Sequence, residues 1–310
     1  GCVLVKGEQV VGEGWHVQAG EGHAEVNALA QAGEQARGAT AYVTLEPCSH
    51  VGKTPPCADA LIAAGVSRVV AAMQDPNPLV AGNGLQRLRD AGIEVTCGLL
   101  EEQARELNPG FIKRMQLGLP WVRVKLAMSL DGRTAMASGE SKWITGPAAR
   151  ADVQRLRARS GAVISGADSV LLDDSALTVR ASELGLSDEE ASAAVQRQPL
   201  RVLIDSLRRV PLEQRFFRES GPTLVISTSA EQAAESYQSI GSELLALPGD
   251  DGKVDLPTVL RTLAERGCNE VLVEAGAALS GAFWRAGLVD ELIVYMAPRL
   301  LGSQARPLMQ

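Results

Sequence analysis

The sequence has 310 residues, 45% of them hydrophobic, which is enough for two domains that each bury a core. Its 30 basic and 37 acidic residues give a net charge of -7, which argues against a general attraction to nucleic acid or to an anionic membrane. No apolar run reaches the roughly 20 residues that span a bilayer. Five cysteines make a sparse and odd set that favours a cytoplasmic protein with thiols available as ligands over a disulfide framework.

The first third of the chain predicts short strands that alternate with helices. A hairpin over 2–15 precedes a helix that ends at Gly33, and the later elements are strands at 41–46, 67–73 and 93–98 and helices at 57–65 and 85–92. This alternation is typical of a mostly parallel sheet covered by helices. The charged segment 101–120, with its Asn-Pro-Gly and Gly-Leu-Pro breaks, predicts a domain boundary near residue 118.

The same alternation restarts after the boundary and predicts a second α/β sheet in residues 119–310. The expected strands are 121–129, 161–166, 201–206, 223–227, 269–276 and 291–298, and the expected helices are 147–160, 256–267 and 278–287. The polar, small-residue stretch 181–198 is interpreted as a surface excursion.

His23, Cys48 and Cys57 supply one imidazole and two thiols, a suitable ligand set for a zinc ion that keeps its fourth position for water. Both cysteines follow prolines and are expected beside helix starts, where thiolates are stabilised. Zinc lowers the pKa of a bound water to about 7. Glu25, two residues after the histidine, is then expected to carry the proton to the ring nitrogen and the leaving amine.

The His-x-Glu and Pro-Cys pattern is the signature of zinc nucleobase deaminases. Eight residues separate Cys48 from Cys57, however, where that signature has two. The alternatives are a core histidine, a structural thiol pair or a purely structural zinc. Cys2, Cys97 and Cys268 are interpreted as packing residues.

The motifs "HAEVNAL", "YVTLEPCSHVGKTPPC" and "DPNP" resemble the bifunctional riboflavin-biosynthesis family that joins a diaminohydroxyphosphoribosylaminopyrimidine deaminase to a 5-amino-6-(5-phosphoribosylamino)uracil reductase. The wide cysteine spacing belongs to that family, and the likeness covers essentially the whole chain. It implies a cytidine-deaminase-like α/β/α domain over 1–118, a dihydrofolate-reductase-like α/β domain over 119–310, and a homodimer through the second domain. The family pattern continues beyond both ends, with an Asn-Pro segment before Gly1 and strands after Gln310.

The resemblance also implies a binding loop between the cysteines. His50 and Lys53 would meet the ribose phosphate of the substrate, and Asp75 and Asn77 of "DPNP" would lie near its pyrimidine. The alternative for "DPNP" is a simple turn, because each of its residues favours one.

The second half resembles the reductase through "KLAMSLDGRTA", "SKWITG", "DSVLLDDSALTVR" and "VEAGAALSGAFW". A strand, a glycine turn and a helix meet at residue 276, where backbone N–H groups can hold a phosphate, although no full dinucleotide-binding glycine motif is present. The resemblance assigns NADPH to Ala127, Trp143, Ser169, Asp173, Ser206, Gly276, Ala277, Ala278, Leu279, Ser280, Gly281 and Ala282. It assigns the substrate to Ser141, Arg157, Leu177, Arg180 and Glu274, and Lys125, a cation in an apolar strand, is a candidate ribose contact.

The planar guanidinium group of arginine suits a phosphate, but a solvated helix face or a surface ion pair is the alternative for Arg157 and Arg180.

The sequence as a whole predicts zinc-dependent hydrolytic deamination of 2,5-diamino-6-(5-phosphoribosylamino)pyrimidin-4(3H)-one, followed by NADPH reduction of its ribosyl group to a ribityl chain. Two alternatives stay open: a nucleic-acid cytosine or adenosine deaminase with an unrelated second domain, and a zinc-stabilised binding module.

Overall fold

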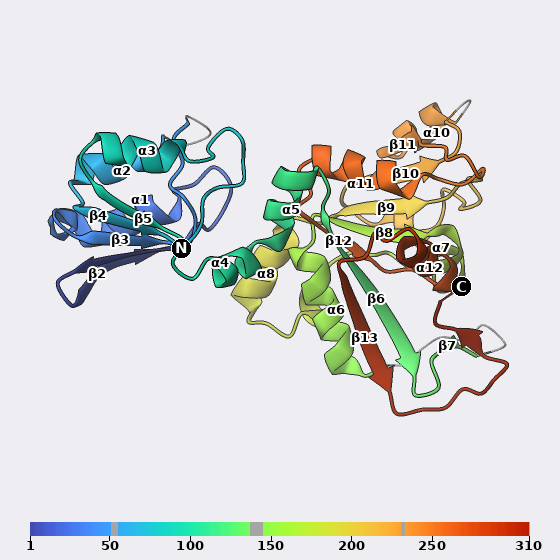
Figure 1. The fold of residues 1–310 in the computed structure, drawn as a ribbon. Coiled ribbons are helices and arrows are strands. Elements are labelled where there is room, and N and C mark those ends of the chain that lie inside the picture. Colours follow the sequence, from blue (N-terminus) through green and yellow to red (C-terminus); the bar gives the residue numbers. More distant parts are fainter. Residues whose placement is uncertain (51–54, 137–144, 231–232, 310) are drawn as a thin grey trace. The chain divides into compact units, whose positions relative to one another are not determined.

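The computed structural model describes residues 1–50, 55–136, 145–230 and 233–309 (Figure 1). The chain divides into two compact units, Gly1–Gln116 and Leu117–Gln310. Within the described residues, no helix combines the length and the apolar character that crossing a bilayer requires.

The first unit contains a five-stranded sheet in the order β2-β1-β3-β4-β5. Its strands are β1 (Cys2–Lys6), β2 (Gln9–Gly14), β3 (Thr40–Val43), β4 (Arg68–Ala71) and β5 (Glu94–Cys97). β1 is antiparallel to β2 and to β3, whereas β3, β4 and β5 are parallel. Its helices are α1 (Ala24–Ala32), η1 (Gly33–Ala36), α2 (Cys57–Ala64), α3 (Asn83–Asp90), α4 (Glu101–Leu107) and α5 (Pro109–Leu117).

Two glycines of β2 allow α1 to lie directly against the sheet. A Cβ atom added to Gly12 would lie 2.3 Å from the carbonyl oxygen of Ala28, and one added to Gly14 would lie 2.4 Å from that of Ala24. Real Cβ atoms do not approach oxygen so closely, so any side chain here would push the helix away. The close approach fixes the helix that carries Glu25.

The second unit contains a seven-stranded sheet in the order β11-β10-β9-β8-β12-β6-β13, in which every neighbouring pair is parallel. Its strands are β6 (Trp121–Ser129), β8 (Ala162–Gly166), β9 (Leu200–Ile204), β10 (Thr223–Ser227), β11 (Ser242–Ala246), β12 (Glu270–Val273) and β13 (Glu291–Ala297). β7 (Arg133–Ala135) and β14 (Arg306–Pro307) form a separate antiparallel pair.

Helices connect these parallel strands and cover both faces of the sheet. They are α6 (Pro147–Arg159), α7 (Ala167–Asp173), α8 (Asp188–Gln196), α9 (Arg215–Arg218), α10 (Ala234–Ser239), α11 (Leu256–Glu265) and α12 (Ala277–Arg285), with a short η2 (Ala181–Glu183). Successive residues of β9 show the two faces: Val202 and Ile204 belong to one buried cluster and Leu203 to another. Burial on both faces explains why apolar residues occupy successive positions in these strands.

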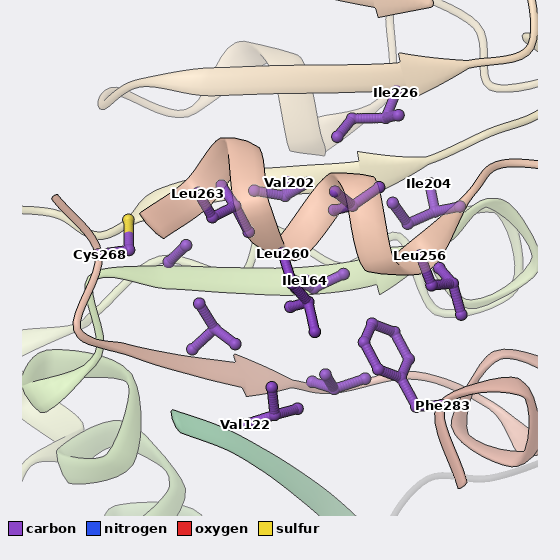
Figure 2. Packing of buried hydrophobic residues seen from close by; sticks show 14 of the residues in the cluster. Val122, Ile164, Val202, Ile204, Ile226, Leu256, Leu260, Leu263, Cys268 and Phe283 are labelled. Atoms are coloured by element: carbon purple, nitrogen blue, oxygen red, sulfur yellow. The ribbon is translucent and has the colours of Figure 1, made fainter. Parts of the chain in front are cut away.

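The larger of these clusters forms between α11 and the sheet. Figure 2 shows leucines of α11 over valine and isoleucine side chains of the strands, with Phe283 of α12 beside them. The labelled residues are Val122, Ile164, Val202, Ile204, Ile226, Leu256, Leu260, Leu263, Cys268 and Phe283. This face of the sheet is therefore closely packed against α11 and α12.

The structure differs from the sequence-based expectations for the segment 181–198 and for Cys97. The segment 181–198 contains helix α8, which begins with a capping box in which Ser187 and Glu190 satisfy each other's backbone N–H groups. The interpretation of Cys97 as a packing residue is wrong, because β5 is the edge strand of its sheet and leaves this thiol exposed.

Candidate functional site

His23, Cys48 and Cys57 come together although they are far apart in the sequence. His23 is the N-cap of α1, Cys48 follows β3, and Cys57 is the first residue of α2. His23 Nδ1 lies 3.6 Å from Cys48 Sγ and 3.3 Å from Cys57 Sγ, and the three ligand atoms lie within 4.8 Å of one another. A tetrahedral zinc ion separates its nitrogen and sulfur ligands by roughly 3.5 Å. The donor set therefore fits zinc in both chemistry and spacing.

The expectation that both cysteines lie at helix starts is right for Cys57 and wrong for Cys48, which lies in a coil. Cys48 nevertheless accepts a hydrogen bond from the Cys57 backbone N–H at the start of α2, at 3.2 Å. Hydrogen bonds from the Cys57 side chain and backbone lower the pKa of Cys48 to about 5. The same side-chain bond and burial raise the pKa of Cys57. Because zinc requires both sulfurs as thiolates, its binding would displace the proton of Cys57.

Glu25 lies in the first turn of α1, and its residue is only 7% exposed. Burial raises the pKa of its carboxyl, and hydrogen bonds from its own backbone N–H and from Cys57 partly oppose that effect. A carboxyl with a raised pKa gains and loses a proton more readily near neutral pH. Glu25 therefore has the position and the electrostatics of a proton carrier beside the metal ligands.

Sequence reasoning missed two residues next to this centre. The His16 ring packs edge-on against His23 with their centroids 5.1 Å apart, and Asn27 Nδ2 donates to the carbonyl oxygens of Trp15 at 2.7 Å and Gly22 at 3.2 Å. Asn27 thus ties the loop that carries His16 to α1. Asn27 could have been found from the sequence, because it lies four residues after His23 and residues at this spacing share one face of a helix.

Asp75 and Asn77 form the turn that was the alternative for "DPNP". Asp75 Oδ1 accepts from the backbone N–H of Asn77 at 2.8 Å, and Asn77 Oδ1 accepts from that of Leu79 at 3.1 Å. Burial raises the pKa of Asp75. The backbone N–H of Asp75 donates to Glu46 Oε2 at 3.1 Å, and Glu46 lies two residues before the ligand Cys48. The "DPNP" segment can therefore form a turn and also belong to the site beside the metal ligands. Lys53 lies outside the described residues.

Most residues assigned to NADPH lie at the carboxyl edge of the second sheet. Ala127 is near the end of β6, Ser169 and Asp173 belong to α7 directly after β8, Ser206 follows β9, and Gly276 follows β12. These four strands are neighbours in the parallel sheet, and ligands of such sheets bind outside the carboxyl ends of the strands. Ser141 and Trp143 lie outside the described residues.

Gly276 is the N-cap of α12, and its backbone N–H donates to Ser169 Oγ at 2.9 Å. This bond leaves the hydroxyl proton of Ser169 free to turn toward a ligand. A Cβ atom added to Gly276 would meet only Ser169 Oγ, at 3.5 Å, so the fold tolerates a side chain there. Ser280 and Gly281 are buried, whereas Gly276 and Ala278 are exposed. The remaining assigned residues, Ala277, Leu279 and Ala282, are half-buried in α12.

Three residues assigned to the substrate form a buried charge cluster. Arg157 binds Glu274 through both arms of its guanidinium, at 2.5 and 3.0 Å, and Lys125 Nζ lies 3.8 Å from Glu274 Oε2. The Arg157 side chain is 11% exposed, so the surface alternative for it is wrong. Burial raises the pKa of Glu274, but the charges of Arg157 and Lys125 outweigh it and hold that pKa below its ordinary value.

Arg180 and Leu177 lie in the segment that follows α7. Arg180 pairs with Glu183 at 2.6 Å and is partly exposed, and its charge also lowers the pKa of Glu274. Leu177 is buried with a φ of 58°, a left-handed conformation that is strained for a leucine. The structure thus gathers a cationic region around one buried carboxylate.

Both units match protein families. Residues 1–73 match the cytidine and deoxycytidylate deaminase zinc-binding region, and residues 120–310 match the RibD C-terminal domain. The riboflavin biosynthesis protein RibD of Escherichia coli (strain K12) is 56% identical, over 99% of this chain and 83% of its own. The predicted pairing of a cytidine-deaminase-like domain with a reductase domain is confirmed.

Solved structures agree with this. Acinetobacter baumannii RibD has 52% identity and a TM-score of 0.90, covering 100% of this chain and 83% of that chain. A diaminohydroxyphosphoribosylaminopyrimidine deaminase/5-amino-6-(5-phosphoribosylamino)uracil reductase of Thermotoga maritima has 35% identity and a TM-score of 0.84, covering 99% and 82%. The chain therefore belongs to the family of the riboflavin biosynthesis protein RibD.

Proposed function

We propose that residues 1–118 form the zinc-dependent deaminase, and residues 119–310 the NADPH-dependent reductase, of a bifunctional riboflavin-biosynthesis enzyme. The substrate is 2,5-diamino-6-(5-phosphoribosylamino)pyrimidin-4(3H)-one, which loses its amine before its ribosyl group is reduced. The observation that carries the proposal is the meeting of His23, Cys48 and Cys57 beside the buried Glu25, in a chain that matches both family domains.

In the deaminase, His23, Cys48 and Cys57 would hold a zinc ion, which would lower the pKa of a bound water. Glu25 accepts the first proton of the attacking water and delivers it to the ring nitrogen, and it then carries the second proton of that water to the leaving amine. Asp75 and Asn77 contact the pyrimidine, while His50 and Lys53 contact the ribose phosphate. The burial of Glu25 and the hydrogen bond that joins the Asp75 backbone to Glu46, two residues before Cys48, support these roles.

In the reductase, NADPH supplies the hydride that reduces C1' of the opened ribose. Gly276 and the first turn of α12 hold a cofactor phosphate, with Ser169 donating from beside them. Arg157, Arg180 and Lys125 bind the phosphorylated substrate around Glu274. The pairing of Arg157 and Lys125 with Glu274, directly after β12, and the hydrogen bond between Gly276 and Ser169 support this division of roles.

Gly276→Val is expected to weaken NADPH binding by at least about tenfold, because the branched side chain would cover the N–H groups at the start of α12. The fold should survive, since the added Cβ atom meets only Ser169 Oγ at ordinary contact distance. NADPH titrated by fluorescence measures the loss. The rate of ammonia release should be unchanged.

Arg180→Ala is the matched variant for the substrate side. It should raise KM for the deaminated intermediate and leave NADPH affinity intact, because the guanidinium is assigned to the substrate. Unchanged NADPH affinity in a folded Gly276→Val protein would refute the phosphate-binding turn. Loss of NADPH affinity in Arg180→Ala would show that substrate and cofactor are assigned to the wrong sides.

We propose further that the chain acts as a homodimer through the reductase unit. β13 is an edge strand of the described sheet, and Leu292, Val294 and Met296 alternate along it as exposed apolar side chains. Light scattering should give twice the mass of one chain. Met296→Lys should shift this toward the monomer, whereas Ile240→Lys, at an exposed position near α10, should not. A monomeric wild-type protein contradicts the proposal.

We place the enzyme in the cytoplasm. Its two ligand thiols must stay reduced to bind zinc, and none of the cysteines within the described residues forms a disulfide. A reducing compartment preserves such a site.

A further inference from the structure

Glu46 is a buried carboxylate that contacts only backbone donors in the described hydrogen bonds. It is 3% exposed and directly precedes the Pro47–Cys48 pair. Its Oε2 accepts from the N–H groups of Asp75 at 3.1 Å and Gly82 at 2.9 Å. Its Oε1 accepts from those of Gly84 at 2.8 Å and Leu85 at 3.2 Å. One side chain therefore fixes both ends of the segment 75–85.

The negative charge of Glu46 has no ion-pair partner within the described parts of the chain, and its stabilisation comes from these N–H groups and from the start of α3. Such bonds are directional, and each oxygen accepts two of them. A glutamine of the same shape would turn one acceptor into a donor that faces N–H groups. The site is thus specific for a carboxylate, beyond what packing alone requires.

Two further contacts lock α3 onto the loop of the metal ligand. A Cβ atom added to Gly84 would lie 1.9 Å from the Pro47 carbonyl oxygen, so only glycine permits this approach. Arg87 Nη1 donates to the Ser49 carbonyl oxygen at 3.1 Å. The loop that presents Cys48 and the segment that presents Asp75 and Asn77 are therefore one joined structure, with Glu46 at its centre.

We infer that Glu46 is a positioning residue of the deaminase, which holds the pyrimidine-facing segment Asp75–Asn77 at a fixed place beside the zinc ligands. The inference rests on the proposed deaminase function. Among the hydrogen bonds of the described residues, the Glu46 carboxylate makes none to a donor atom of the metal ligands. It acts through the backbone of Asp75 and through the start of α3, much as outer groups orient the ligands of metal sites.

Glu46→Gln should keep its zinc and lower kcat/KM for deamination about 10- to 100-fold, the usual cost of losing such a supporting contact. The lower kcat/KM should come from a higher KM, because the displaced segment holds the pyrimidine and carries no reacting group. Glu46→Asp, which keeps the charge on a shorter side chain, should recover part of the lost kcat/KM. Glu94→Gln, at an exposed glutamate of β5, is the matched control and should change nothing.

Reduction of the deaminated intermediate by the same preparations reports folding of the other unit and should stay at the wild-type rate. In an Asn77→Ala background, Glu46→Gln should lower kcat/KM for deamination by a smaller factor than in the wild type, because the two residues act through one segment. An equal factor in both backgrounds, loss of zinc, or an unchanged KM would overturn the inference. A wild-type chain that releases no ammonia would instead refute the proposed function.

Discussion

Glu25→Gln is expected to lower ammonia release about 10²- to 10⁴-fold while the protein keeps its zinc. The amide has nearly the same shape as the carboxyl and leaves His23, Cys48 and Cys57 in place, but it cannot accept and deliver a proton. Burial already raises the pKa of Glu25, which suits that task. Metal analysis and an ammonia assay on the same preparation separate ligation from proton transfer.

Glu34→Gln is the control for this change, because Glu34 is an exposed glutamate just after the same helix. It should release ammonia at the wild-type rate. Deamination retained in Glu25→Gln would remove Glu25 from its assigned role and leave His16, which packs against His23, as the next group to test.

Cys57→Ala is expected to lose zinc and deamination together. It removes one of three donors and also the thiol that hydrogen-bonds to Cys48 and lowers its pKa, so the remaining pair binds metal poorly. NADPH-dependent reduction of the deaminated intermediate should continue, since that site belongs to the other unit. Zinc content measured against both activities tests this.

Cys97→Ala provides the comparison, because Cys97 is the exposed cysteine at the edge of the sheet. It should keep both its zinc and its deaminase activity. A Cys57→Ala protein that is active and full of zinc would show that a different residue completes the ligand set.

The sequence predicts the elements well where hydrophobic periodicity is strong. The predicted strand 223–227 matches the bounds of β10, whose residues are all buried, and the predicted strand 121–129 matches those of β6 although Arg123 and Lys125 interrupt its apolar residues. The helix α7 was missed. It has only seven residues, too few for a helical repeat of apolar positions to stand out, and it directly follows β8.

The metal ligands could be predicted because their chemistry is visible in the residue types themselves. Glu46 could not, since its partners are backbone N–H groups from 75 to 85, and a backbone group has no sequence signature. The pairing of Arg157 with Glu274 joins positions 117 residues apart. Only the folded sheet brings such a pair together.

The central claim is that one chain carries out the two reactions in order, and a coupled assay tests it most directly. The full chain is supplied with the phosphoribosylaminopyrimidine substrate and NADPH, and ammonia release and NADPH oxidation are followed together. We expect one NADPH to be oxidised for each ammonia released, with both reactions stopped in Glu25→Gln and only NADPH oxidation restored by adding the deaminated intermediate. Ammonia release without any NADPH oxidation, or NADPH oxidation that continues in Glu25→Gln on the original substrate, would contradict it.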